Sequence, residues 1–206
     1  EFRALGFNTE FKVSFDGLGH HDWLRGVPHA EETALRALRL VKEKGFPARA
    51  QTNVHRGNIH VMYDTVKLLD EMGVDEVRII RTTETPRWRE NGGDATLGIL
   101  EYYGEMLKLV DALLQSGCKI RVDVWQFLHY DPAALTYSYH PVQVQCSRYK
   151  GSIPACKGAR GTVAISYNGE IYPCNQTSGT FASMGISFGN VKQSPLQKLL
   201  TSGDYL

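Results

Sequence analysis

The 206-residue sequence has few cysteines, no long apolar run and no charge bias, and each shortage excludes a class of protein. Four cysteines are too few for a disulfide scaffold, and they fit a reducing, cytoplasmic setting. No stretch approaches the roughly 20 apolar residues that span a bilayer, so we expect no association with a membrane. A net charge of +1 lacks the basic bias of nucleic-acid binders, so we expect no nucleic-acid partner. The first residues do not have the pattern of a signal peptide.

The composition is that of a globular protein, with 42% hydrophobic and 22% charged residues. Strand and helix patterns alternate from residue 10 to residue 125. The predicted strands are residues 10–16, 48–54, 74–80 and 119–125. Apolar stripes at helical spacing lie between them, and Gly45, Gly73 and Gly117 are placed to end these helices. The alternation predicts four parallel strands connected by three helices.

Four such strands are half of an eight-stranded barrel, so the predicted fold class is α/β, a partial (β/α) barrel of parallel strands. We expect this first domain to span residues 1–130, with a polar loop at residues 81–93. The sequence begins almost on a strand, which indicates a piece of a larger protein.

The pattern changes after residue 130, where residues 131–206 predict a second, smaller module without a large apolar core. Residues 130–152 show no helical period and are expected to be mostly loop. Asn168-Gly169 lies between two short strand-like runs and predicts a hairpin with a two-residue turn. We also expect a Ser- and Gly-rich loop at residues 177–187 and a short helix at 195–200.

Three of the four cysteines, Cys146, Cys156 and Cys174, lie in this tail with the spacing C-x9-C-x17-C. A zinc ribbon would use paired CxxC motifs, which this sequence lacks. An iron–sulfur cluster accepts thiolates from scattered loop positions, and the basic residues near the first two cysteines would offset its negative charge. From the residues alone, a cluster and three buried structural thiols remain alternatives. Cys118 lies between a helix end and a strand, which favours a core thiol.

Two ordered sets of residues resemble one known family. Val13-Ser14-Phe15-Asp16-Gly17, His21-Asp22 and Arg25 resemble the fourth-strand segment of radical S-adenosylmethionine (radical SAM) enzymes that carry a SPASM accessory domain. The tail resembles the first part of that domain, through Cys156, through Asn168–Cys174 and through Phe188-Gly189-Asn190-Val191. The resemblance covers residues 10–202 in the right order. The sequence lacks the CxxxCxxC motif and the C-terminal cysteine cluster of the family.

The resemblance implies that Ser14 and Arg25 hold the carboxylate of S-adenosylmethionine. It also implies that Cys146, Cys156 and Cys174 converge as ligands of a 4Fe–4S cluster. In this family S-adenosylmethionine is cleaved reductively to a 5′-deoxyadenosyl radical, which abstracts hydrogen from a peptide or protein substrate. Flavodoxin or ferredoxin would donate the electron. The part given by this sequence is expected to be inactive alone.

Asn175 directly follows the hairpin cysteine, where sulfatase-maturing members of the family have an Asp that acts as a base. Because an amide takes up no proton at neutral pH, this favours the maturation of ribosomal peptides through thioether or carbon–carbon crosslinks. Two other functions stay open, a non-catalytic peptide-binding barrel and a metal-free β/α-barrel enzyme with structural thiols.

Other polar residues carry weaker signals. We expect Asn53 and Arg81, at the ends of the next two strands, to face the same cavity as Ser14, with no role assigned. His20-His21-Asp22 is interpreted as a structural turn rather than a metal site. The remaining histidines show no partner spacing and are expected to be ordinary core or surface residues; they include His55, His60, His129 and His140.

Overall fold

The computed structural model describes residues 5–7, 9–141, 143–145, 151–154, 158 and 161–203. The chain divides into two compact units, which are described separately. The first consists of residues 1–83 and 94–140, and the second of residues 84–93 and 141–206. The domain boundary expected near residue 130 stays a prediction.

The first unit is built on a six-stranded sheet in the order β1-β2-β3-β4-β5-β6. The strands are β1 (Phe11–Ser14), β2 (Ala48–Val54), β3 (Glu76–Arg81), β4 (Arg121–Val124), β5 (Leu128–Asp131) and β6 (Thr136–Tyr139). Strands β1 to β4 pair in parallel, whereas β5 and β6 are antiparallel additions. The parallel strands confirm the predicted α/β fold class.

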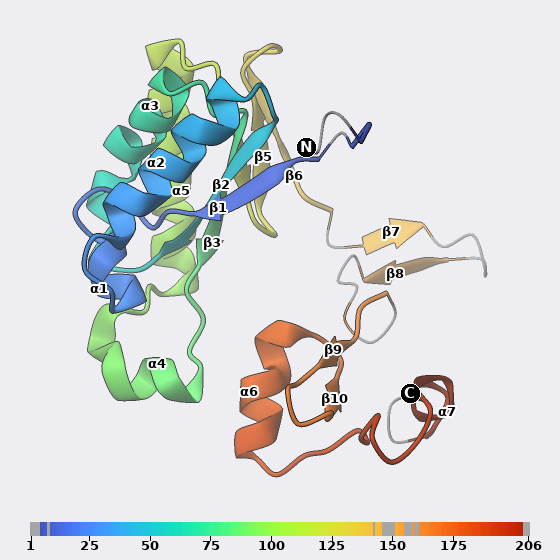
Figure 1. Ribbon diagram of the computed structural model, residues 1–206. Coiled ribbons are helices and arrows are strands. Elements are labelled where there is room, and N and C mark those ends of the chain that lie inside the picture. Colours follow the sequence, from blue (N-terminus) through green and yellow to red (C-terminus); the bar gives the residue numbers. More distant parts are fainter. Residues whose placement is uncertain are drawn as a thin grey trace. The chain divides into compact units, whose positions relative to one another are not determined.

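The helices of this unit are α1 (His21–Arg25), α2 (Ala30–Glu43), α3 (Met62–Glu71) and α5 (Ile99–Ser116), with short 3-10 turns η1 (Ile59–Val61) and η2 (Gly93–Ala95). Figure 1 shows α2, α3 and α5 on one face of the sheet. Strand β2 explains this arrangement, since its residues alternate between buried and partly exposed. Its buried side chains join the core between sheet and helices. Full burial of one large apolar side chain contributes about 1.5–3 kcal/mol, so this core supplies most of the unit's stability.

The predicted helix ends are confirmed at all three glycines. Gly117 has φ 69° and is the left-handed C-cap of α5, and Gly45 and Gly73 have φ values of 72° and 73°. Residues with a Cβ adopt this conformation at a cost, which is why glycine ends these helices. Among the described residues, no helix has both the length and the apolar character needed to cross a membrane.

The expectation of a loop after residue 130 is wrong for residues 128–139. Strands β5 and β6 occupy this stretch. Asp131 Oδ1 accepts hydrogen bonds from the backbone N–H groups of Ala133 and Ala134, which shapes the turn between the strands. Leu128 and Tyr130 are buried, whereas all four residues of β6 are exposed. Thr136-Tyr137-Ser138-Tyr139 alternates polar and aromatic residues, which is a strand pattern, so β6 could have been predicted from its sequence.

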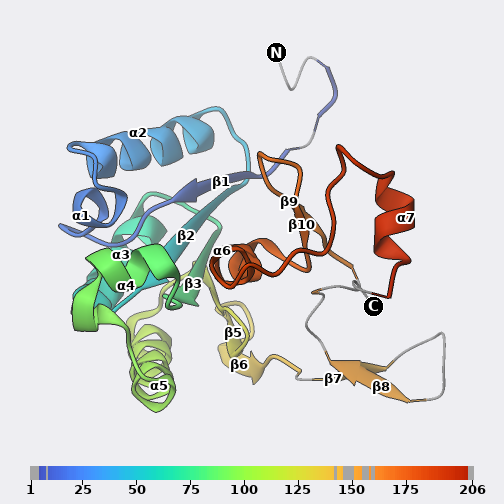
Figure 2. The same cartoon turned by 90° about the horizontal axis from the view of Figure 1, so that it is seen from below.

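The second unit consists of α4 (Pro86–Asn91), β7 (Gln143–Gln145), β8 (Ser152–Pro154), β9 (Ala164–Ile165), β10 (Ile171–Tyr172), α6 (Asn175–Ser183) and α7 (Leu196–Leu200). Strands β7 and β8 pair antiparallel, as do β9 and β10. Figure 2 shows α6 beside the β9–β10 hairpin. The expected hairpin and the expected short C-terminal helix are both confirmed.

Two helices of this unit lie where loops were predicted. Helix α4 lies in the polar stretch 81–93, where Thr85 Oγ1 accepts a hydrogen bond from the Trp88 N–H and Pro86 starts the helix. That pattern is an ordinary helix-start signal. Helix α6 replaces most of the expected loop at 177–187; its Ser, Thr and Gly residues are weak helix formers, and it packs against the hairpin.

The hairpin turn also differs from the expected two-residue form. The Gly169 N–H donates to the Ser166 carbonyl, and the Ser166 N–H donates to the Glu170 carbonyl, at 2.9 Å each. The loop is therefore Tyr167-Asn168-Gly169, and of these only Gly169 has a positive φ, at 93°. This is the three-residue hairpin loop that ends in a glycine bulge.

Candidate functional site

A row of polar side chains crosses the face of the sheet opposite α2, α3 and α5. Strand register aligns Ser14 of β1 with Gln51 of β2, then with Arg78 of β3 and Asp123 of β4. Neighbouring strands lie about 4.8 Å apart, and residues aligned in register point to the same face. The sheet therefore presents one continuous polar row that begins at Ser14, which is exposed.

Asp16, two residues after Ser14, has a fully buried carboxylate with several partners. Its Oδ2 lies 2.7 Å from Arg25 Nη2 and 2.9 Å from His21 Nδ1. Its Oδ1 accepts a hydrogen bond from the Asn53 N–H at 2.9 Å. A buried charge is costly unless it is paired and hydrogen-bonded, and these contacts meet that condition. The loop after β1 is consequently tied to α1 and to β2.

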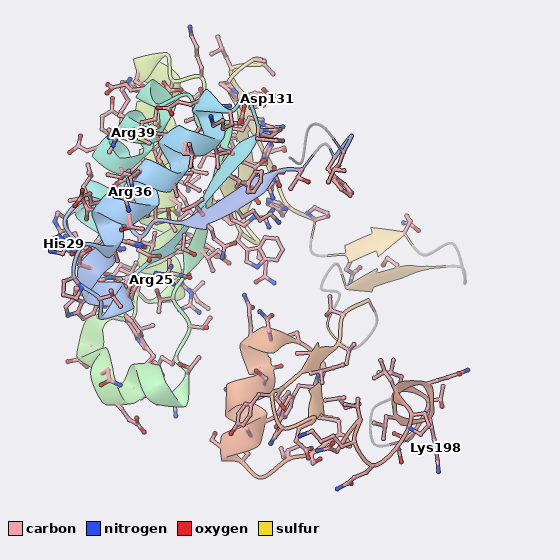
Figure 3. The ribbon with its side chains drawn as sticks, in the orientation of Figure 1. Arg25, His29, Arg36, Arg39, Asp131 and Lys198 are labelled. Carbon is pink, nitrogen blue, oxygen red and sulfur yellow. The ribbon has the colours of Figure 1, made fainter. Side chains whose placement is uncertain are left out.

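Arg25 is the last residue of α1, and Figure 3 shows it beside α1, near the C-terminal end of β1. Its side chain is 35% exposed although it binds Asp16. A guanidinium has five N–H donors in a planar fork, so it can bind Asp16 and a second carboxylate together. The shared role of Arg25 and the exposed Ser14 in binding a carboxylate stays a prediction.

Asn53 and Arg81 do not share a face of the sheet, contrary to expectation. Asn53 is in register with Ile80, and Arg81 with Val54. Because side chains alternate along a strand, Arg81 belongs to the face that α2, α3 and α5 cover. Its Nη1 donates to the Leu97 carbonyl at 2.9 Å, so it anchors the chain before α5.

A charged group at the other end of the polar row escaped the sequence analysis. The side chain of Asp123 is 5% exposed, and its two oxygens lie 2.6 Å from Arg78 Nε and 2.9 Å from His140 Nε2. The guanidinium of Arg78 also lies over the Trp125 ring, at 4.6 Å. No spacing rule joins these residues, because only the strand register brings them together.

Three histidines also meet beside this sheet. The His20 ring lies 5.4 Å from the His60 ring and 6.4 Å from that of His55, which is 5.0 Å from the Trp23 ring. Burial, assisted by the charge of His20, lowers the pKa of His55. Among the residues that the structure describes, no group of three or more His, Cys, Asp or Glu side chains is arranged to hold a metal ion.

The His20-His21-Asp22 segment has the structural role that the sequence predicted, but His21 and Asp22 begin helix α1 and only His20 lies in a turn. Asp22 accepts hydrogen bonds from the N–H groups of His29 and Glu31, both at 2.7 Å, at the start of α2. The Glu31 hydrogen bond is the main cause that lowers the pKa of Asp22. A carboxylate at a helix N-terminus is favoured by the free N–H groups and by the helix dipole.

In the second unit, Cys174 lies directly before α6, with its Sγ 3.3 Å from Thr177 Oγ1. Burial opposes the thiolate, but hydrogen bonds from the Thr177 side chain and from the backbone of Thr177 and Gln176 outweigh it and lower the pKa of Cys174. A lowered thiol pKa suits a thiolate ligand of iron. Cys146 and Cys156 lie outside the described residues, so the convergence of three sulfurs stays a prediction. Cys118 is buried, and burial raises its pKa, which confirms a core thiol.

The two segments of the tail that resemble the family lie together. The Ile171 N–H donates to the Gly189 carbonyl and the Val191 N–H donates to the Gly169 carbonyl, both at 2.9 Å. Asn190 Nδ2 also donates to the Glu170 carboxylate. The hairpin that carries Cys174 is thereby fixed by the segment around Asn190, 15 residues and more further along the chain.

Comparison with known proteins gives a family for the C-terminal part. Residues 156–206 match SPASM, an iron–sulfur cluster-binding domain. By sequence, the chain is 23% identical to the AdoMet-dependent heme synthase of Methanosarcina barkeri, over 97% of this chain and 55% of that protein. It is 22% identical to the enzyme of the same name from Nitratidesulfovibrio vulgaris, over 94% of this chain and 51% of that protein. The chain thus spans about half the length of the curated relatives it matches.

By structure, the chain is similar to SuiB of Streptococcus suis. The TM-score is 0.62 against SuiB bound to S-adenosylmethionine and 0.67 against SuiB bound to its precursor peptide SuiA. Each comparison covers 94% of this chain and 42% of SuiB at 13% identity, which shows the shared fold.

The resemblance predicted from the sequence is therefore confirmed, since the chain matches SPASM over residues 156–206, is similar in sequence to AdoMet-dependent heme synthases and shares the fold of SuiB. More particularly, the chain shares the fold of SuiB, and the SPASM match lies in its C-terminal part, where the sequence predicted it.

Proposed function

We propose that the chain is the central part of a radical SAM/SPASM enzyme that modifies a peptide or protein by 5′-deoxyadenosyl-radical hydrogen abstraction. Its products would be ribosomal peptides with thioether or carbon–carbon crosslinks. The observation that carries this proposal is the likeness to SuiB over 94% of the chain, which includes a SuiB structure bound to a precursor peptide. An electron donor such as flavodoxin or ferredoxin would be its partner.

In this proposal Ser14 and Arg25 bind the carboxylate of S-adenosylmethionine. The exposed hydroxyl at the end of β1 and the half-exposed guanidinium anchored on Asp16 support this role. Bound S-adenosylmethionine supplies the radical that abstracts hydrogen, and the chain's own residues hold and orient it. The polar row from Gln51 to Asp123 would line the cavity that receives the substrate.

The same proposal makes Cys146, Cys156 and Cys174 ligands of an auxiliary 4Fe–4S cluster. Its support is the match to an iron–sulfur cluster-binding family over residues that include Cys156 and Cys174. The lowered pKa of Cys174 and its position at the end of a fixed hairpin are what a thiolate ligand needs. Asn175 follows it and is the first residue of α6, so no carboxylate base stands at this position.

The curated relatives support a second candidate function. Three relatives by sequence are named AdoMet-dependent heme synthases, so the substrate would then be a tetrapyrrole rather than a peptide. Both candidates share the binding of S-adenosylmethionine, and they differ in the molecule that loses hydrogen.

The test uses the full-length protein that contains this chain, loaded with iron and sulfide under anaerobic conditions. With S-adenosylmethionine and a reductant, it should release 5′-deoxyadenosine, and Arg25→Ala should lower this rate roughly ten- to hundredfold, because a charge-assisted hydrogen bond is lost. Arg36→Ala, at an exposed position of α2, is the matched control and should leave the rate unchanged. A cluster-loaded protein that releases no 5′-deoxyadenosine would contradict the proposal. Binding of a porphyrin but not of peptides would favour the second candidate.

A further inference from the structure

We propose that Asp16 is a positioning residue, which aims Arg25 at the carboxylate of S-adenosylmethionine and so makes the site selective for ligands that carry this carboxylate. The inference rests on the proposed function, because it deepens the role given there to Arg25. It assigns to Asp16 no contact with the ligand itself.

The first support is the spacing of the partners of Asp16 on α1. His21 and Arg25 are four residues apart, so their side chains lie on the same side of this short helix. Both reach the same oxygen, Oδ2, from that side. One carboxylate therefore fixes the first and the last residue of α1, which sets the direction of the Arg25 side chain.

The second support is the contrast in burial between the partners. The side chain of Asp16 is fully buried and that of His21 is 5% exposed, whereas that of Arg25 is 35% exposed. The ion pair thus holds the guanidinium through Nη2 while about a third of the Arg25 side chain stays accessible. A long Arg side chain otherwise samples many rotamers, and ordering it in advance removes an entropic cost from ligand binding.

The third support is the rigidity of Asp16 itself. Its Oδ1 accepts the Asn53 N–H at 2.9 Å and its carbonyl accepts from Asn58 Nδ2 at 2.6 Å. The next residue, Gly17, has φ 104°, and an added Cβ would lie 2.7 Å from Met62 Cε. The carboxylate is consequently fixed to β2, and the backbone of Asp16 to Asn58 at the start of η1, so Asp16 can impose a direction on Arg25 rather than follow it.

The experiment compares two ligands on the full-length, cluster-loaded protein: S-adenosylmethionine and decarboxylated S-adenosylmethionine. Asp16→Asn keeps an oxygen for the Asn53 N–H but removes the charge that holds Arg25. We expect it to weaken S-adenosylmethionine binding roughly tenfold or more and to leave the affinity for the decarboxylated ligand nearly unchanged, because only the carboxylate contact depends on Arg25. In an Arg25→Lys background, which lacks the planar fork, Asp16→Asn should have little further effect.

Thr52→Val is the matched control, since Thr52 Oγ1 donates to the Phe15 carbonyl beside Asp16 and does not touch Arg25. It should leave the ratio of the two affinities unchanged. If Asp16→Asn weakens both ligands equally, Asp16 is only a structural residue and the inference is overturned. If this variant does not fold, Asp16→Glu, which keeps the charge but displaces it, should still lower the ratio, and an unchanged ratio would overturn the inference. A wild-type protein that binds S-adenosylmethionine no better than its decarboxylated form would instead refute the carboxylate site of the proposed function.

Discussion

Two cysteines show how a few neighbouring atoms decide what a thiol can do. Cys118 lies in the core, where burial raises its pKa, while hydrogen bonds at the start of α6 outweigh the effect of burial and lower the pKa of Cys174. The thiolate is the form that binds iron and reacts with electrophiles. The same residue type is therefore inert at one position and suited to chemistry at the other.

This contrast predicts the order of thiol reactivity in cluster-free protein. Iodoacetamide should alkylate Cys174 much faster than Cys118 near neutral pH, because the thiolate of Cys174 forms at lower pH and its side chain is accessible. The measurement is mass spectrometry of peptides after timed alkylation, and Thr177→Val should slow the reaction of Cys174. Faster labelling of Cys118 in folded protein would contradict the assignment.

Local sequence motifs pointed to some candidate site residues and could not point to others. Ser14 and Arg25 belong to one continuous segment, and α1 places Arg25 four residues after His21. Asp123 and His140 lie 17 residues apart on separate elements, and only the antiparallel return of β5 and β6 joins them. The face of Arg81 was assigned wrongly for a related reason, since β3 has charged residues at both parities and its sequence does not reveal which face is covered.

At the end of the sheet opposite to Ser14, the carboxylate of Asp75 joins helix α2 to strand β2. Its Oδ2 accepts from Lys42 Nζ of α2 at 2.7 Å and from the Ala48 N–H of β2 at 2.8 Å. Burial opposes the charged form, but these two hydrogen bonds outweigh it and lower the pKa of Asp75.

The lowered pKa fixes the pH range in which Asp75 stabilises the fold. A folded-state pKa below the unfolded value adds stability above about pH 4, and this stability is lost as the pH falls through the folded-state pKa. Asp75→Asn should lower the free energy of unfolding by about 0.5–1 kcal/mol at pH 7, a modest value because the carboxylate is 40% exposed. Urea unfolding at pH 7 and at pH 3 measures the change in the free energy of unfolding. Lys42→Met should lower this free energy over the same pH range as Asp75→Asn. A deficit that persists unchanged at the lower pH would contradict the account.

The hairpin that carries Cys174 depends on one glycine. Gly169 has φ 93°, and an added Cβ would lie 2.5 Å from Asn190 Oδ1. We expect Gly169→Ala to destabilise the second unit by about 1–3 kcal/mol, through the left-handed backbone and the clash with Asn190.

Gly179 of α6 provides the matched control, because an added Cβ there meets nothing within 4 Å. Gly179→Ala should stabilise the helix by about 0.5–1 kcal/mol. Thermal unfolding of both variants gives the comparison. Equal changes in the free energy of unfolding for the two substitutions would show that the turn does not need glycine.

The elements that sequence patterns predicted are those with strong periodicity and marked ends. Strands β1 to β4 and helices α2, α3 and α5 combine apolar stripes with glycine stops, and all of them form. Of the elements that were missed, α6 has no buried residue and forms by packing against the β9–β10 hairpin, whereas the alternation in β6 covers only four exposed residues and the strand forms by pairing with β5. Contacts with neighbouring elements decide whether such a segment forms a helix or a strand, and local propensity does not reveal these contacts.

At the scale of the whole molecule, the chain combines a β/α unit that presents a polar row with a second unit whose hairpin presents a cysteine. The first unit carries Ser14, Asp16 and Arg25 at the end of β1, and the second carries Cys174 within the SPASM match. One chain would therefore carry two sites, a carboxylate site for S-adenosylmethionine and a cluster held by cysteines.

The cluster is the claim that one measurement tests most directly. Iron, acid-labile sulfide and the electron paramagnetic resonance spectrum are measured on anaerobically purified full-length protein, as wild type, Cys174→Ala and Cys118→Ala. The account predicts that Cys174→Ala loses the iron and sulfide of one 4Fe–4S cluster and the corresponding signal, whereas Cys118→Ala keeps both, because Cys118 is a buried core thiol. If Cys174→Ala retains the iron, the sulfide and the spectrum of the wild type, Cys174 does not bind a cluster and the central claim is wrong.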